Sequence, residues 1–155
     1  MAIEIERKFL IRNDTWKLAT KTSIDIKQGY LSLEENCTVR VRCTNNQAFL
    51  TIKGKTSGIS RKEFEYVIPR EEADEILNSM CVGYIISKTR HIIEFSGHRW
   101  EIDEFFGDNS GLVLAEIELQ AEEEAFNKPS WLGEEVSTDP KYFNANLIKT
   151  PFLKW

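Results

Sequence analysis

Pairs of carboxylates two residues apart are the feature of this sequence that most clearly indicates a chemical function. Glu4 and Glu6 form one pair, and Glu116 and Glu118 form another. In a β-strand, side chains two residues apart point to the same face, about 6 to 7 Å from each other. Two such pairs that face one another supply oxygen ligands for a hard divalent cation, Mg²⁺ or Mn²⁺. Either pair alone is more typical of a solvated strand surface, so the metal site depends on both.

Further charged residues stand at alternate positions of other candidate strands, which places them on one face of each strand. Glu63 and Glu65 form a third acidic pair, and Asp103 is a single acid. The basic residues of this kind are Lys8, Arg40, Arg42, Lys53, Lys88 and Arg90. Guanidinium groups bind phosphate oxygens through paired hydrogen bonds, and ammonium groups act as point charges. Carboxylate-held metal beside convergent cations predicts phosphoryl transfer, and the absence of a GxxxxGK[ST] loop excludes a P-loop mechanism.

Alternating apolar and charged residues predict the strands that must position these side chains. The pattern is clear in residues 3–11 and recurs in residues 38–42 and 50–55. The eight candidate strands cover residues 3–11, 23–32, 38–42, 50–55, 61–68, 84–95, 99–105 and 112–120. Amphipathic helices are predicted over Pro69–Met80 and Asp139–Ile148, both as lids on apolar sheet surface.

The predicted fold is mostly β (α+β), an eight-stranded antiparallel β-barrel tunnel with flanking helices. Helices can cover only the apolar faces of such a barrel, so the charged faces should line its interior. An interior lined by both signs of charge is costly unless close partners or a ligand offset the desolvation. We therefore interpret the interior as a wet functional channel.

Composition limits the classes of function. The chain has 155 residues and a formal net charge of -5, which favours one domain over residues 1–155 and argues against nucleic-acid or membrane-surface binding. Cys37, Cys43 and Cys81 show no metal-ligand spacing and are expected to be reduced thiols. The acidic start and the lack of a long apolar stretch predict a cytoplasmic protein with no membrane span. The composition is compatible with either a monomer or a homodimer.

An ordered series of motifs covers essentially the whole chain. Residues 4–8 have the form ExExK, and Gln28-Gly29-Tyr30-Leu31 follows. Further motifs stand at residues 39–42, 51–54, 61–65, 87–90, 100–105 and 114–118, and the series ends near Tyr142-Phe143-Asn144. This series resembles the CYTH domains, also called triphosphate tunnel metalloenzymes, and most closely the short bacterial inorganic triphosphatases.

The resemblance implies an eight-stranded tunnel, dependence on Mg²⁺ or Mn²⁺, and hydrolysis or cyclisation of a triphosphate. The acids it implies for metal and water are Glu4, Glu6, Glu63, Glu65, Asp103, Glu116 and Glu118. The triphosphate clamp it implies is Lys8, Arg40, Arg42, Lys53, Lys88 and Arg90. Tyr30 matches a tunnel tyrosine that can pair with Lys8. The residues expected to take part in catalysis are Lys8, Tyr30, Glu63 and Glu65.

The expected reaction is hydrolysis of inorganic tripolyphosphate to pyrophosphate and phosphate. One alternative is a thiamine or nucleoside triphosphatase, and another is a class IV adenylate cyclase, whose adenine pocket has no recognisable motif here. A third alternative is a catalytically silent polyphosphate-binding module. That alternative is disfavoured because phosphate binding needs the cations but not the full acidic set.

Overall fold

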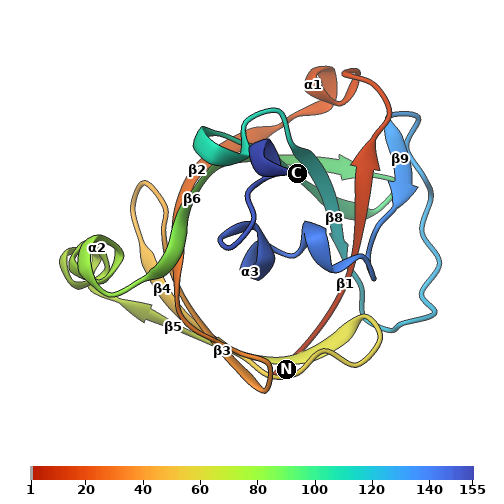
Figure 1. Ribbon diagram of the computed structural model, residues 1–155. Coiled ribbons are helices and arrows are strands. Elements are labelled where there is room, and N and C mark those ends of the chain that lie inside the picture. Colours follow the sequence, from red (N-terminus) through yellow and green to blue (C-terminus); the bar gives the residue numbers. More distant parts are fainter. Residues whose placement is uncertain (1) are drawn as a thin grey trace.

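The predicted strands close into an antiparallel barrel in the computed structural model, which describes residues 2–155 (Figure 1). The strands are β1 (Ile3–Ile11), β2 (Thr22–Glu34), β3 (Cys37–Cys43), β4 (Ala48–Lys53), β5 (Ser60–Ile68), β6 (Val82–Phe95), β7 (His98–Phe105), β8 (Val113–Glu118) and β9 (Leu132–Glu135). Their order is β5-β4-β3-β2-β6-β7-β8-β1, and pairing of β1 with β5 closes eight strands into a ring. The predicted fold class is confirmed.

The ninth strand was not predicted. It pairs with the end of β1, where Phe9 lies opposite Glu135 and Ile11 opposite Leu132, with an irregularity between the two pairs. β9 has only four residues and no apolar alternation, so period-two patterning could not reveal it.

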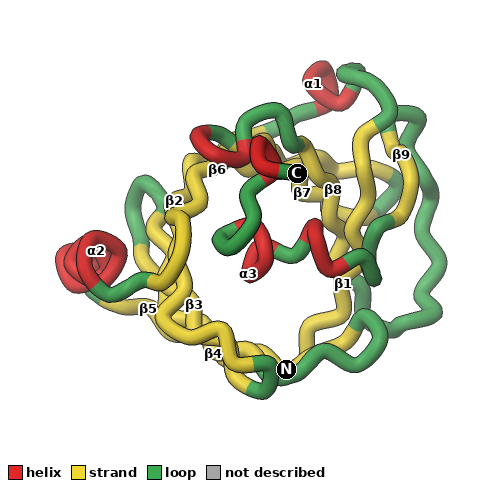
Figure 2. Tube along the Cα trace, viewed as in Figure 1, coloured by secondary structure: helices red, strands yellow, loops and turns green. Residues whose placement is uncertain are grey.

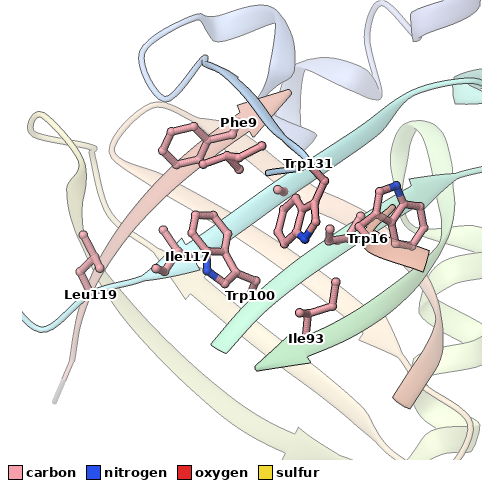
Figure 3. Packing of buried hydrophobic residues seen from close by; sticks show 10 residues of the cluster. Phe9, Trp16, Ile93, Trp100, Ile117, Leu119 and Trp131 are labelled. Carbon is pink, nitrogen blue, oxygen red and sulfur yellow. The ribbon is translucent and has the colours of Figure 1, made fainter. Parts of the chain in front are cut away.

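Two apolar clusters lie on the outer face of the barrel and form most of the core. In the larger cluster Trp100 meets Phe9 and Trp131 edge-on, with ring centroids 5.7 and 5.6 Å apart (Figure 3). The short helix α1 (Trp16–Ala19) adds the buried Trp16 to this cluster. Edge-to-face aromatic contacts of this kind contribute about 0.5 to 1.5 kcal/mol beyond simple burial. The apolar parity of the strands therefore faces outward, as predicted.

The second outer cluster lies under α2 (Arg70–Ser79), which confirms the first predicted helix. Ala73 and Leu77 of this helix pack on Val41, Cys43 and Ala48 of β3 and β4. Pro69 precedes the first helical residue and Glu71 and Glu72 occupy the first turn, where acidic side chains interact favourably with the helix dipole. The amphipathic spacing thus predicted both the helix and the face that it covers.

The second predicted helix was wrong in both extent and place. Asp139 does cap a turn, since its Oδ1 accepts a hydrogen bond from the Lys141 amide at 3.2 Å, but this turn is a 3-10 helix over Pro140–Tyr142. Phe143 is extended, with φ -70° and ψ 132°, and interrupts the helix before α3 (Asn144–Leu147). Viewed along the barrel, α3 lies within the ring of strands (Figures 1 and 2).

The C-terminal segment fills one end of the barrel interior. Leu147 and Ile148 are fully buried and pack in one cluster with Ile86, Phe105 and Leu114. The last three have the parity of the charged residues on their strands, so they point inward. The interior is therefore apolar and filled at one end, and the charged side chains occupy the remainder.

The remaining expectations from composition can be compared with the structure directly. Cys37, Cys43 and Cys81 are all free thiols. Across residues 2–155, each helix is too short or too polar to cross a lipid bilayer.

Candidate active site

The barrel encloses a cavity of about 660 Å³ lined by side chains of both charges. Charged residues from β1, β3, β4, β5, β6 and β8 reach it because each presents its charged parity inward. The expected site residues that line it are Glu4, Glu6, Lys8, Tyr30, Arg40, Arg42, Lys53, Glu63, Glu65, Lys88, Arg90, Glu116 and Glu118. Residues more than 100 positions apart in the sequence thus meet in one chamber.

Pairing of β1 with β8 brings the two main acidic pairs together. Glu6 lies opposite Glu118, and Lys8 lies opposite Glu116. Burial opposes the charge of Glu116, but Lys8, whose Nζ is 3.6 Å from it, and Arg90 outweigh burial and lower the pKa of Glu116 to about 2. This carboxylate is therefore held ionised on the cavity wall.

Glu6 has the opposite electrostatic environment. Burial, reinforced by the negative charges of Glu116 and Glu4, raises its pKa well above the usual range of a carboxyl group. Within residues 2–155, no three His, Cys, Asp or Glu side chains stand close enough together to enclose a metal ion unaided. The donor chemistry still fits a divalent cation, because carboxylates are the ligands that hard cations prefer and the negative charges of Glu4 and Glu116 act on Glu6.

Lys53 and Arg40, two of the expected clamp residues, are paired with acids of β1 and β5. Lys53 Nζ lies 3.2 Å from Glu4 Oε1 and 3.1 Å from Glu63 Oε2. Arg40 Nη2 is 3.7 Å from Glu65 Oε2, and the hydroxyl of Thr51 donates to the same carboxylate oxygen at 2.8 Å. Acids on neighbouring strands thus offset the charges of both cations.

Asp103 occupies a different place from the one expected of a metal or water ligand. It is completely buried beneath the lining side chains of Arg90 and Lys88 and does not itself line the cavity. Arg90 binds it through two parallel hydrogen bonds of 2.8 and 2.9 Å, and Lys88 Nζ lies 2.8 Å away. Although burial opposes ionisation, these cations hold the pKa of Asp103 well below its usual range. Its acceptor oxygens are engaged by Arg90 and Lys88.

The cations at the inner end of the cavity are crowded. Burial, together with Arg40 and Arg90, lowers the pKa of Arg42 to about 9. Burial also lowers the pKa of Lys88 to about 7, with Arg90 and Arg42 acting in the same direction against the attraction of Asp103. Crowded, desolvated cations of this kind are stabilised by a bound polyanion.

Lys8 is oriented by the C-terminal segment. Its Nζ donates to the carbonyl oxygen of Tyr142 at 3.1 Å and lies 6.0 Å from the centre of the Phe143 ring. Tyr30 is buried beside the cavity and contributes to the apolar cluster under α3. Lys8 and Tyr30 both line the cavity, and their pairing stays a prediction beside the backbone contact of Lys8.

Several polar residues of the site were missed by the sequence reasoning. Glu101 lies 3.4 Å from Arg90 and lines the cavity, and its spacing of two from Asp103 could have revealed it. Gln28 and Asn144 hydrogen-bond to each other and to site cations. Both belong to the motif series, but amides carry no charge and were given no role.

Comparison with known proteins is consistent with this geometry. The CYTH domain family matches residues 2–150. An inorganic triphosphatase from Acetivibrio thermocellus is 47% identical over 152 residues, which cover 98% of this chain and 97% of that protein. An inorganic triphosphatase from Nitrosomonas europaea is 35% identical over 148 residues, covering 93% and 95% of the two chains.

Solved structures show the same fold. A crystal structure of an inorganic triphosphatase superimposes with a TM-score of 0.69 at 31% identity, covering 96% of this chain and 95% of the other. A candidate adenylate cyclase from Bacillus halodurans superimposes with a TM-score of 0.62 at 18% identity, with 79% and 84% of the chains covered, which shows a shared fold alone. With its barrel, its charged cavity and a family match along nearly its whole length, this chain belongs to the CYTH domain family.

Proposed function

We propose that this protein is a divalent-metal-dependent triphosphatase that hydrolyses inorganic tripolyphosphate to pyrophosphate and phosphate. The observation that carries the proposal is the cavity, where paired carboxylates and convergent cations from six strands meet. Polyphosphate needs the cations, and its hydrolysis with a divalent metal needs the acids. The names of the relatives that are 47% and 35% identical support the same reaction.

The acids of β1 and β8 are suited to hold the metal. Glu4, Glu6, Glu116 and Glu118 would ligate Mg²⁺ or Mn²⁺, in keeping with the metal dependence of CYTH triphosphatases. When bound, the metal would supply Lewis-acid stabilisation of the phosphoryl group and of the attacking oxygen. Asp103 has no part in this set, because its oxygens already accept hydrogen bonds from Arg90 and Lys88.

The cations bind the phosphate chain and oppose its charge. Arg40, Arg42, Lys53, Lys88 and Arg90 surround the cavity, so the non-reacting phosphates are held while the terminal phosphate stays accessible to water. The oxygen of water attacks the terminal phosphorus in line, the bond from that phosphorus to the bridging oxygen breaks, and pyrophosphate departs. The proton from the attacking water passes to a carboxylate of the Glu63 and Glu65 pair.

The substrate preference follows from the lining. The charged residues of the cavity offer contacts to phosphate, and the inner end is filled by Leu147 and Ile148. A phosphate chain with a free end can enter this chamber from the charged side. We therefore propose tripolyphosphate as the preferred substrate over ATP or thiamine triphosphate.

A substrate panel tests the proposal. Tripolyphosphate, ATP and thiamine triphosphate are compared with Mg²⁺ and with Mn²⁺, and the products are resolved by ion chromatography. We expect phosphate and pyrophosphate from tripolyphosphate, with Glu4→Gln and Glu116→Gln inactive but folded by circular dichroism. Hydrolysis in excess chelator would refute the metal dependence. Cyclic AMP as the main product would favour a cyclase, and binding without turnover would favour a silent module.

The cellular location and the oligomeric state are proposals as well. We propose that residues 1–155 act as one catalytic domain in the cytoplasm, which the three free thiols support; Met1 lies outside the described residues. A homodimer stays a prediction that light scattering in solution would test.

A further inference from the structure

Two residues of the motif series, Gln28 and Asn144, have no part in the proposed chemistry. Gln28 belongs to β2 and is completely buried, and Asn144 is the first residue of α3. They are 116 positions apart in the chain, yet Gln28 Nε2 donates to Asn144 Oδ1 at 3.0 Å. A buried amide is costly unless its groups are hydrogen-bonded, so this contact requires an explanation.

The two amides form a continuous chain between two cations of the cavity. Arg42 Nε donates to Gln28 Oε1 at 2.9 Å, and Lys88 Nζ donates to Asn144 Oδ1 at 3.1 Å. Arginine and lysine side chains have donors only, so each cation fixes which way its amide partner must point. Once Gln28 Oε1 faces Arg42, its Nε2 faces Asn144, whose oxygen then accepts from both Gln28 and Lys88. The whole chain has one consistent arrangement of donors and acceptors.

These amides are neutral, unlike the carboxylates that pair with Lys53 and Arg40. Lys53 and Arg40 are paired with glutamates, which cancel their charge when no substrate is bound. An amide oxygen orients a cation while leaving its charge free to attract an anion. Arg42 has its guanidinium Nε held in this way, and Lys88 is shared between Asn144 and the buried Asp103.

We propose that Gln28 and Asn144 are positioning residues that hold Arg42 and Lys88 in the orientation needed for the phosphate chain and, being neutral, add no negative charge to the one that Asp103 already places beside Lys88. The inference rests on the proposed function, because it assigns these cations to the triphosphate. It also gives the C-terminal segment a role, since the same segment orients Lys8 through the carbonyl oxygen of Tyr142. The segment that fills the barrel therefore fixes the cations beside it.

The first test compares loss of the amide chain with loss of an unrelated amide in the same helix. Asn144→Ala and Gln28→Met should each raise the KM for tripolyphosphate about 10- to 100-fold, as expected for hydrogen bonds to charged groups, with a smaller change in kcat. The double variant should be little worse than the poorer single variant, because both act through one chain. Asn146→Ala is the matched control, since Asn146 also lines the cavity but its Nδ2 donates to the Pro140 carbonyl oxygen at 2.7 Å, and within residues 2–155 its side chain forms no hydrogen bond with a clamp residue.

The second test separates orientation from charge. Asn144→Asp keeps an oxygen acceptor for Gln28 and Lys88 and should unfold at the same temperature as the wild type or higher. Its carboxylate would add a second negative charge beside Lys88, which already contacts Asp103, and would repel the phosphate chain, so its KM should still rise at least tenfold. A residue with only a structural role would give a near-normal KM whenever the fold is retained.

Binding is measured beside turnover so that the two proposals can fail separately. Calorimetry with tripolyphosphate in chelator gives Kd without hydrolysis, and thermal unfolding reports folding. An unchanged KM and Kd in Asn144→Ala and Gln28→Met, or an equal rise in Asn146→Ala, would overturn the inference. A wild-type chain that binds tripolyphosphate without hydrolysing it would refute the proposed function, while the order of Kd values would still decide the role of the amides.

Discussion

Removal of the buried carboxylate of Asp103 is the perturbation whose outcome follows most directly from the structure. In Asp103→Ala, Arg90 loses two hydrogen bonds of 2.8 and 2.9 Å and Lys88 loses a contact of 2.8 Å. Lys88 stays buried, and Arg90 keeps only its longer contacts of 3.4 Å with Glu101 and 3.8 Å with Glu116. We expect a large loss of stability, because breaking a buried ion pair leaves uncompensated charge.

The size of the loss can be bracketed. Removing one partner of a buried pair costs about 3 to 5 kcal/mol, a large share of the roughly 5 to 15 kcal/mol by which a typical domain is stable. Lys88 can relieve part of this cost by losing its proton, since burial already lowers its pKa to about 7, whereas Arg90 stays charged. For a chain of this size the Tm should fall by roughly 6 to 20 °C. Asp103→Asn keeps an acceptor oxygen and should lose about 1 to 3 kcal/mol.

Urea unfolding and thermal unfolding of both variants provide the measurement, with metal affinity determined in parallel by calorimetry. If Asp103→Ala destabilised the fold by less than about 1 kcal/mol, the buried pair would carry less energy than this reasoning assigns. If metal affinity collapsed while stability was unchanged, Asp103 would be a metal ligand after all, as the sequence motifs implied.

The remaining predictions concern the division of labour in the cavity and the fit of the C-terminal segment. Glu118→Gln should lower kcat, because a metal-holding acid acts in the transition state, and single-turnover kinetics would detect the loss. Arg40→Ala should mainly raise KM in steady-state kinetics, whereas Lys8→Ala should depress kcat as well, by up to about 10² to 10³ for a contact close to developing charge. Near-normal constants in all three would mean that the cavity is not the active site. Gly83→Ala should lower the Tm, because Gly83 has φ +68° and a Cβ there would lie 2.5 Å from the Ile148 carbonyl oxygen; the left-handed backbone alone costs about 1 to 2 kcal/mol.

The barrel could be predicted because each strand repeats one simple pattern. In β1 and β3 the charged and apolar parities are separate, and only a closed sheet reconciles so many charged faces with so few helices. Both parities were assigned correctly, inward for charge and outward for apolar side chains. Period-two patterning therefore predicted which side chains of these strands point into the barrel.

The C-terminal segment shows where periodicity stops being informative. Phe143 and Leu147 have helical spacing, but Phe143 is extended and Leu147 enters the barrel instead of covering its outside. An apolar face can be buried on either side of a sheet with the same sequence pattern. Its destination depends on the empty space at the end of the barrel, which is a property of the closed fold.

The alternation of charged and apolar residues also could not predict how deep in the barrel each inward side chain lies. Asp103 and Glu116 share the inward parity of adjacent strands, yet Glu116 lines the cavity and Asp103 lies behind it. The register decides the outcome, because Arg90 lies directly opposite Asp103 and takes both of its oxygens. Gln28 was overlooked for a related reason, since an amide at an inward position looks neutral until its partners across the barrel are known.

The pairing within the cavity also explains how one barrel can carry charges of both signs without a ligand. Lys53 lies between Glu4 and Glu63, which offset its charge, while Gln28 and Asn144 add no negative charge beside Arg42 and Lys88, of which only Lys88 also contacts Asp103. A phosphate chain is therefore attracted first to the inner cations. If Glu4 turns to a metal, Lys53 loses one partner and becomes available to phosphate. The acids and cations thus stabilise one another in the free protein through the same groups that would separate to bind metal and substrate, which ties occupancy of the two sets together.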